Sequence, residues 1–207
     1  MTPLTTRLSS LTRRAAAALL AALSLTAAGT AAVAATPAAP QVRFVTSEGD
    51  FVVEVYPDKA PKTVENFLQY VKDKHYDGTI FHRVISNFMI QGGGYDSHYA
   101  EKATRPPVVH EGREALAKGG PTNTVGTLAM ARTNNPNSAT AQFFINVNDN
   151  AFLNPSAQSP GYTVFGKVIS GMDVVNKIKA VPTGAGGNFS SDVPQTPVVI
   201  KSATLIH

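Results

Sequence analysis

Residues 81–94 read FHRVISNFMIQGGG, and this stretch carries most of the information about the fold. Residues 79–84 and 88–91 are rich in β-branched and aromatic residues, and the turn-forming pair Ser86-Asn87 lies between them. This pattern predicts two strands joined by a tight turn. The three glycines at 92–94 are expected to end the second strand.

Arg83 is the charged residue at the centre of this apolar stretch. In a regular strand Phe81, Arg83 and Ile85 point to the same face, so Arg83 is expected to project from a surface lined with aromatic side chains. A surface arginine whose alkyl chain covers apolar neighbours would give the same pattern. The strand pattern alone leaves both interpretations open.

A second informative stretch is MARTNNPNSATAQFFINV, residues 130–147. Its polar first half, residues 132–141, contains three asparagines and predicts a loop. Gln142 then precedes Phe143 and Phe144, which in a strand point to opposite faces. An outward phenylalanine beside an outward glutamine is not explained by core packing and indicates a binding surface.

The rest of the chain after residue 41 alternates short β-rich runs with turn-forming residues. Residues 61–74 and a short segment around 174–178 have helical spacing, and the polar segments 94–125 and 182–197 are expected to be loops. Strands are predicted at 42–46, 51–56, 79–84, 88–91, 126–131, 142–147, 163–169 and 198–206. The predicted fold is mainly β, either a barrel or a sandwich.

Together with GYTVFG at 161–166, the two stretches resemble the cyclophilin family of peptidyl-prolyl cis-trans isomerases, over roughly residues 42–206. The resemblance is strongest to the bacterial periplasmic branch. It implies a closed eight-stranded antiparallel β-barrel capped by two α-helices. It also implies an enzyme that accelerates rotation about Xaa-Pro bonds in proline-containing polypeptide clients.

The resemblance assigns roles to individual residues. Arg83 corresponds to the catalytic arginine, and Gln91 supports it and meets the substrate backbone. The implied substrate-binding residues, with the proline pocket at 88, 89, 144 and 153, are Phe88, Met89, Ala131, Arg132, Gln142, Phe144, Phe152, Leu153 and Tyr162.

Three of these residues depart from the pattern of the eukaryotic members. Phe152 stands where tryptophan is usual, Tyr162 where histidine is usual, and Arg132 where asparagine is usual. The role at Arg132 is expected to be carried by main-chain groups. Without the indole N–H of tryptophan, binding of cyclosporin is expected to be weak.

The implied chemistry needs no nucleophile, general base, metal or cofactor, and none is predicted. The sequence has no His-x-x-x-His spacing, and His82 is interpreted as structural although it precedes Arg83. The alternative function is a module that binds proline-containing segments as a chaperone or adaptor with little turnover. A surface-anchored structural protein is a third hypothesis.

Residues 1–35 differ in composition from the rest. Arg7, Arg13 and Arg14 precede an apolar run of about 14 residues and then small residues, which is the order of a cleavable signal peptide. Cleavage is expected after Ala34 or Ala35, and an uncleaved anchor or a twin-arginine signal are alternatives. Residues 36–41 are predicted to be a short linker and 42–207 the isomerase domain. The expected location is periplasmic or secreted, with no stable membrane contact after cleavage.

Composition restricts the other function classes. The net charge is +4, but the three arginines of the leader account for most of it, and the remaining 15 basic and 14 acidic residues give +1. A nearly neutral domain has no electrostatic reason to bind nucleic acid. The chain has no cysteine, which excludes disulfides and thiolate metal sites. No amphipathic stretch is left over for self-association, so a monomer is expected.

Overall fold

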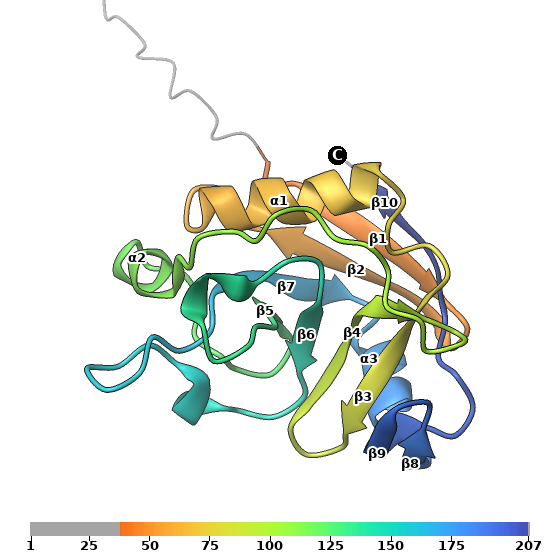
Figure 1. Cartoon of the computed structure of the whole chain (residues 1–207). Helices are drawn as coiled ribbons and strands as arrows, with labels where there is room; N and C mark the ends of the chain where they lie inside the picture. Colours follow the sequence, from red (N-terminus) through yellow and green to blue (C-terminus); the bar gives the residue numbers. More distant parts are fainter. Residues whose placement is uncertain (1–37, 207) are drawn as a thin grey trace, which may run out of the picture. The chain divides into compact units, whose positions relative to one another are not determined.

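The computed structural model describes residues 38–206, which form an antiparallel barrel with helices packed around it (Figure 1). The predicted signal peptide therefore lies outside the described residues, as do the first two residues of the linker. The first strand begins at Gln41, the last residue of the predicted linker. No helix in the described part of the chain is long and apolar enough to cross a membrane.

The main sheet has eight strands in the order β10-β1-β2-β7-β5-β6-β4-β3, and all pairings are antiparallel. The strands are β1 (Gln41–Thr46), β2 (Gly49–Val55), β3 (Thr79–Ile85), β4 (Met89–Asp96), β5 (Thr127–Met130), β6 (Phe143–Asn146), β7 (Val164–Ser170) and β10 (Ile200–Leu205). Eight strands were predicted in these places, with bounds that differ by a few residues except at β4.

The sheet closes because β3 meets the segment that leads into β10. Ile80 and Val199 form an antiparallel bridge. On either side of it, the Gly78 N–H donates to the Ile200 carbonyl at 2.8 Å and the Phe81 N–H donates to the Val198 carbonyl at 3.0 Å. Closure satisfies the backbone groups that an open sheet would leave exposed at its edges. The predicted closed barrel is thus confirmed.

The barrel is filled by aromatic rings that alternate with outward-facing residues along the strands. Phe44 of β1 lies at the centre, 5.0 Å from Phe51, 5.5 Å from Phe143 and 6.1 Å from Tyr76, measured between ring centroids. Each of these rings is at most 1% exposed. Burying such large apolar groups is the main force that holds the barrel together.

The prediction of two helices is incomplete, because the structure has three: α1 (Pro61–Lys72), α2 (Gly112–Ala117) and α3 (Met172–Lys179), besides the short 3-10 turns η1 (Pro136–Ser138) and η2 (Ala151–Leu153). The α2 helix lies in the segment 94–125, which was expected to be a loop. With six residues it is too short to show a clear hydrophobic repeat.

The three glycines at 92–94 do not end β4, contrary to the prediction. They lie inside the strand, at positions where neighbouring groups leave no room for a side chain. A Cβ atom at Gly93 would lie 2.8 Å from the Tyr76 ring, and one at Gly94 would lie 2.5 Å from Gln142. Here glycine permits close packing of the sheet against its neighbours.

The segment 182–197 also contains structure that the sequence did not predict. It forms a second, two-stranded sheet, β8 (Thr183–Gly186) and β9 (Phe189–Pro194). This hairpin packs against β3 at one end of the barrel (Figure 1). It therefore lies next to the strand that carries Arg83.

Candidate active site

A β-bulge places Arg83 on the outer face of the barrel. Along the β3–β4 ladder Phe81 pairs with Gly92 and Arg83 pairs with Gln91, so two residues of β3 match one residue of β4. The extra residue shifts the alternation of side chains. Phe81 and Val84 consequently enter the core, at 0% and 1% exposure, whereas the Arg83 side chain is exposed. The expectation that Phe81 and Arg83 share one face is therefore wrong.

Arg83 opens onto a pocket of about 320 Å³ on the outside of the barrel. Ten of the eleven predicted site residues line it: Arg83, Phe88, Met89, Gln91, Ala131, Arg132, Gln142, Phe144, Leu153 and Tyr162. The structure thus brings together residues from three separate stretches of sequence. Sequence reasoning missed three further lining residues, His82, Tyr95 and Phe189.

The floor of the pocket is a small apolar cluster that is separate from the barrel core. Met89, Phe144 and Leu153 belong to it and are 2%, 4% and 8% exposed. Phe88 and Tyr162 pack against its edge, and the Tyr162 ring meets the Phe144 ring edge-on at 5.5 Å. Phe144 therefore points outward while its neighbour Phe143 fills the core, as the alternation predicted.

Polar groups are arranged around this floor. The Gln91 side-chain amide donates to the Gln142 side-chain oxygen at 3.0 Å, which fixes the orientation of both amides. Among the described residues, no acceptor or acid pairs with the Arg83 guanidinium. Its donors are therefore available to a bound molecule, at the rim of an apolar surface.

The Arg132 side chain has a structural role that the sequence did not indicate. Its guanidinium donates two hydrogen bonds to the Gly161 carbonyl, at 3.1 and 2.9 Å, and lies over the Tyr162 ring at 4.6 Å. It thereby fastens the segment that carries Tyr162 to the end of β5. Within the described residues, the Arg132 backbone N–H and C=O make no backbone hydrogen bond. Both groups are therefore available for main-chain contacts.

Phe152 is the one predicted site residue that does not line the pocket. Its side chain is 71% exposed and stacks on Phe88, with the ring centroids 5.6 Å apart. It extends the apolar rim of the pocket outward. A phenyl ring there offers contact area but no hydrogen-bond donor.

His82 is buried beside Arg83 and is held in its neutral form. Burial, and to a lesser extent the charge of Arg83, lowers the pKa of His82 from 6.5 to about 4. Its ring lies 4.7 Å from the Tyr95 ring, and its Nδ1 atom has no hydrogen-bond partner among the described residues. The side chain is 3% exposed, which agrees with its interpretation as a structural residue.

The lowered pKa of His82 predicts that acid destabilises the protein. Between pH 6.5 and about 4 the unfolded chain binds a proton at this histidine and the folded chain does not. The free energy of unfolding should therefore decrease as the pH is lowered through this window, and His82 should account for up to about 3 kcal/mol of the decrease. Urea unfolding at pH 7, 5 and 4 measures the effect.

The matched variant for this measurement is His82→Asn, which cannot titrate and should show a smaller loss across the same window. Burial also lowers the pKa of His75 and His110, so some dependence should persist. Hydrogen bonds lower the pKa of the Asp73 and Asp96 carboxyls, so these two groups affect stability only below this pH window. An identical pH dependence in both proteins would contradict the assignment to His82.

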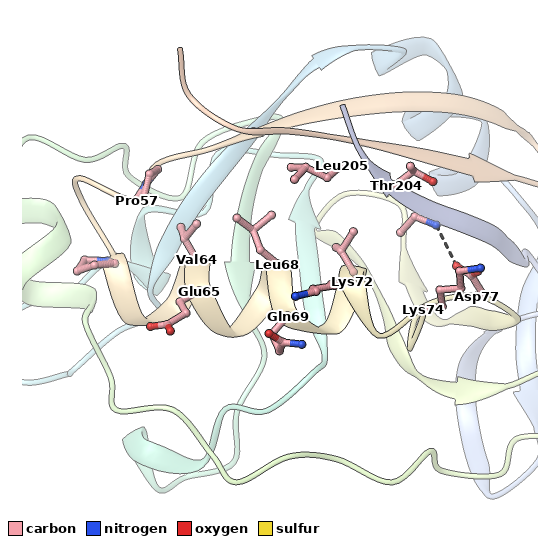
Figure 2. Close-up of a pocket in the computed structure, with 13 residues that line it drawn as sticks. Pro57, Val64, Glu65, Leu68, Gln69, Lys72, Lys74, Asp77, Thr204 and Leu205 are labelled. Carbon is pink, nitrogen blue, oxygen red and sulfur yellow. Dashed lines mark hydrogen bonds between the residues drawn. The ribbon is translucent and has the colours of Figure 1, made fainter. Parts of the chain in front are cut away.

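A larger groove of about 660 Å³ lies elsewhere on the molecule, between α1 and β10 (Figure 2). Its walls are mainly apolar, with Val64 and Leu68 of α1 facing Leu205 of β10. The hydrogen bond from the Ala203 N–H to Asp77 lies at one end. None of the predicted site residues lies in it. Its lining, as far as the described residues form it, contains no arginine and no paired amides, so the candidate site is the smaller pocket.

Comparison with known proteins agrees with this geometry. The family model of cyclophilin type peptidyl-prolyl cis-trans isomerase/CLD matches residues 41–205. A peptidyl-prolyl cis-trans isomerase B of Escherichia coli is 54% identical over 167 residues, which cover 79% of this chain and 98% of the relative. A peptidyl-prolyl cis-trans isomerase A of Dickeya dadantii is 47% identical over 196 residues, which cover 95% and 99% of the two chains.

A solved structure has the same fold. The crystal structure of a cyclophilin type peptidyl-prolyl cis-trans isomerase of Cryptosporidium parvum superimposes with a TM-score of 0.65 at 26% identity, covering 82% of this chain and 98% of its own. The chain therefore belongs to the cyclophilin family, and its enzymatic class is peptidyl-prolyl cis-trans isomerase.

Proposed function

We propose that Arg83 and the apolar pocket beside it are the catalytic centre at which this chain isomerises Xaa-Pro bonds. An Xaa-Pro bond rotates over a barrier of about 18–20 kcal/mol that arises from amide resonance. Twisting the bond localises the lone pair on the proline nitrogen and makes this nitrogen a hydrogen-bond acceptor. A donor aimed at the nitrogen therefore binds the twisted state more strongly than either planar isomer, which lowers the barrier.

The exposed guanidinium of Arg83 lies at the rim of an apolar floor and has no partner within residues 38–206, and this observation supports the assignment. Arginine stays charged at any relevant pH, and its planar fork can meet the proline nitrogen and a carbonyl together. Met89, Phe144 and Leu153 would hold the proline ring while the preceding residue swings. The free backbone groups of Arg132 and the paired amides of Gln91 and Gln142 would hold the substrate main chain.

The alternative is a module that binds proline-containing segments with little turnover. The two functions share the apolar pocket and differ in the need for Arg83. Exchange NMR of a short Xaa-Pro peptide with the wild-type protein and Arg83→Ala separates them, since only the enzyme loses acceleration on mutation. A crystal structure of the Cryptosporidium relative was obtained in the presence of the dipeptide Ala-Pro, which is consistent with proline recognition at this fold.

We further propose that the clients are exported polypeptides whose folding is limited by proline isomerisation, and that the protein acts as a periplasmic or secreted monomer. The leader-like composition of residues 1–35 supports export. N-terminal sequencing of the exported protein tests it, and a first residue of Met1 or Thr2 would rule out cleavage. A light-scattering mass well above that of one chain would rule out the monomer.

Weak binding of cyclosporin follows from the residue at position 152. Phe152 is exposed at the pocket rim and has no N–H group to donate. Phe152→Trp restores a donor, and one added hydrogen bond should raise cyclosporin affinity about fivefold, as measured by calorimetry. Unchanged affinity in this variant would show that position 152 does not limit binding.

A further inference from the structure

Three aromatic residues form one end of the pocket, which we call the aromatic corner: His82, Tyr95 and Phe189. The Phe189 ring lies 5.4 Å from the His82 ring and 5.1 Å from the Tyr95 ring, the latter edge-on at 90°. Tyr95 and Phe189 are half-buried rather than part of the core. The corner therefore presents two aromatic surfaces to the pocket that contains Arg83.

The packing of the β8–β9 hairpin positions Phe189 at the pocket. Gly187, with φ of +54°, lies so close to Tyr99 that a Cβ atom there would be 2.4 Å from the Tyr99 ring. A Cβ at Gly186 would be 2.9 Å from the Tyr99 hydroxyl. The glycines thus allow the turn of the hairpin to pack against Tyr99, and the hairpin side packs against β3. Phe189 follows this turn directly at the start of β9.

The order of the strands shows how a bound peptide would reach the corner. Across the pocket the elements follow in the order β5, β6, β4, β3 and then β9. Arg132 follows β5, the apolar floor lies over β6 and β4, Arg83 is on β3, and Phe189 is on β9. The main-chain groups at Arg132 and the aromatic corner are therefore at opposite ends of the pocket, with the catalytic arginine between the floor and the corner.

We propose that the aromatic corner binds an apolar, preferentially aromatic, side chain one or two positions after the substrate proline. In this proposal the residues before the proline lie at Arg132, and the chain that leaves the proline ring passes Arg83 toward Phe189. The floor and Phe189 line the same pocket of about 320 Å³, and β9 packs on β3, the neighbour of β4. One or two extended residues, at about 3.3–3.6 Å each, together with an aromatic side chain reach from one to the other. The proposal rests on the assignment of the catalytic centre to Arg83.

The test measures kcat/KM of the full chain on three peptides: Ala-Ala-Pro-Phe, Ala-Ala-Pro-Ala and Phe-Ala-Pro-Ala. We expect the wild-type protein to prefer the first over the second by roughly three- to tenfold, as aromatic contacts allow. The preference should appear in KM, because the corner contacts planar and twisted substrate equally. In Phe189→Ala the ratio between these two peptides should approach one.

Two variants sharpen this test. Phe189→Leu keeps an apolar side chain on the hairpin and should retain part of the preference. Ser190→Ala changes the exposed neighbour of Phe189 and should retain all of it. A wild-type protein without the preference, a preference that survives Phe189→Ala, or a preference for the peptide with Phe before proline would each overturn the proposal. Arg83→Ala tests the catalytic centre separately, since it should lower turnover of all three peptides alike.

Discussion

Replacing Arg83 by alanine should lower kcat/KM for a short Xaa-Pro peptide by roughly 10²–10³-fold, the usual effect of removing one donor aimed at a developing charge. The apolar floor of Met89, Phe144 and Leu153 should stay intact in this variant, because these side chains belong to one apolar cluster of buried residues. Peptide affinity should therefore change much less than turnover. Exchange NMR measures both quantities in one sample.

Two further variants define what Arg83 contributes. Arg83→Lys keeps the positive charge but loses the planar fork, so its activity should fall between those of the wild type and Arg83→Ala. Arg43→Ala removes an exposed arginine on β1, a strand that contributes nothing to the pocket, and should leave turnover unchanged. Wild-type turnover in Arg83→Ala would refute the mechanism. Binding without acceleration by the wild type would favour the proline-binding module.

The residues that line the pocket were assigned from the resemblance to the cyclophilin family, and local patterns pointed to only some of them. An outward aromatic next to a glutamine, as in Gln142-Phe143-Phe144, has no use in a core, and it marked the pocket floor correctly. Arg83 stands out as a charge in an apolar strand, but the strand pattern leaves its role open, and the bulge changes the alternation of side chains there. At Phe144, in contrast, a few adjacent residues determine which side chains point outward.

The features that the sequence did not reveal depend on contacts between distant segments. The bulge at Arg83 depends on the register of β3 against β4, which no pattern within β3 alone records. Phe189 reaches the pocket only because a hairpin some hundred residues away in sequence folds against β3. The glycines at 92–94 resemble a strand end in the sequence. Glycine is needed at 93 and 94 because Tyr76 and Gln142 lie too close to leave room for a side chain. Such features require the assembled barrel.

A similar long-range contact supports α1 and predicts a large effect on stability. This helix begins at Pro61, and the residue before it, Ala60, has no side chain that could accept a hydrogen bond from the first turn. Glu111, from the segment 94–125, supplies the acceptor. Its carboxylate accepts from the Lys62 N–H at 3.2 Å, from the Thr63 N–H at 2.8 Å and from the Thr63 hydroxyl at 2.7 Å. Glu111 is 8% exposed, so water cannot replace these bonds easily.

Glu111→Ala should therefore lower the free energy of unfolding by about 2–4 kcal/mol, because it leaves buried donors unpaired and removes a negative charge from the positive end of the helix dipole. Glu111→Gln keeps one acceptor oxygen but loses the charge, so it should cost about half as much. Glu114→Ala, at an exposed position on α2, is the matched control and should stay within about 0.5 kcal/mol of wild type. Urea unfolding at pH 7 measures all three. If Glu111→Ala were as stable as the control, the first turn of α1 would not depend on this contact, and the segment 94–125 would contribute little to holding the helix on the barrel.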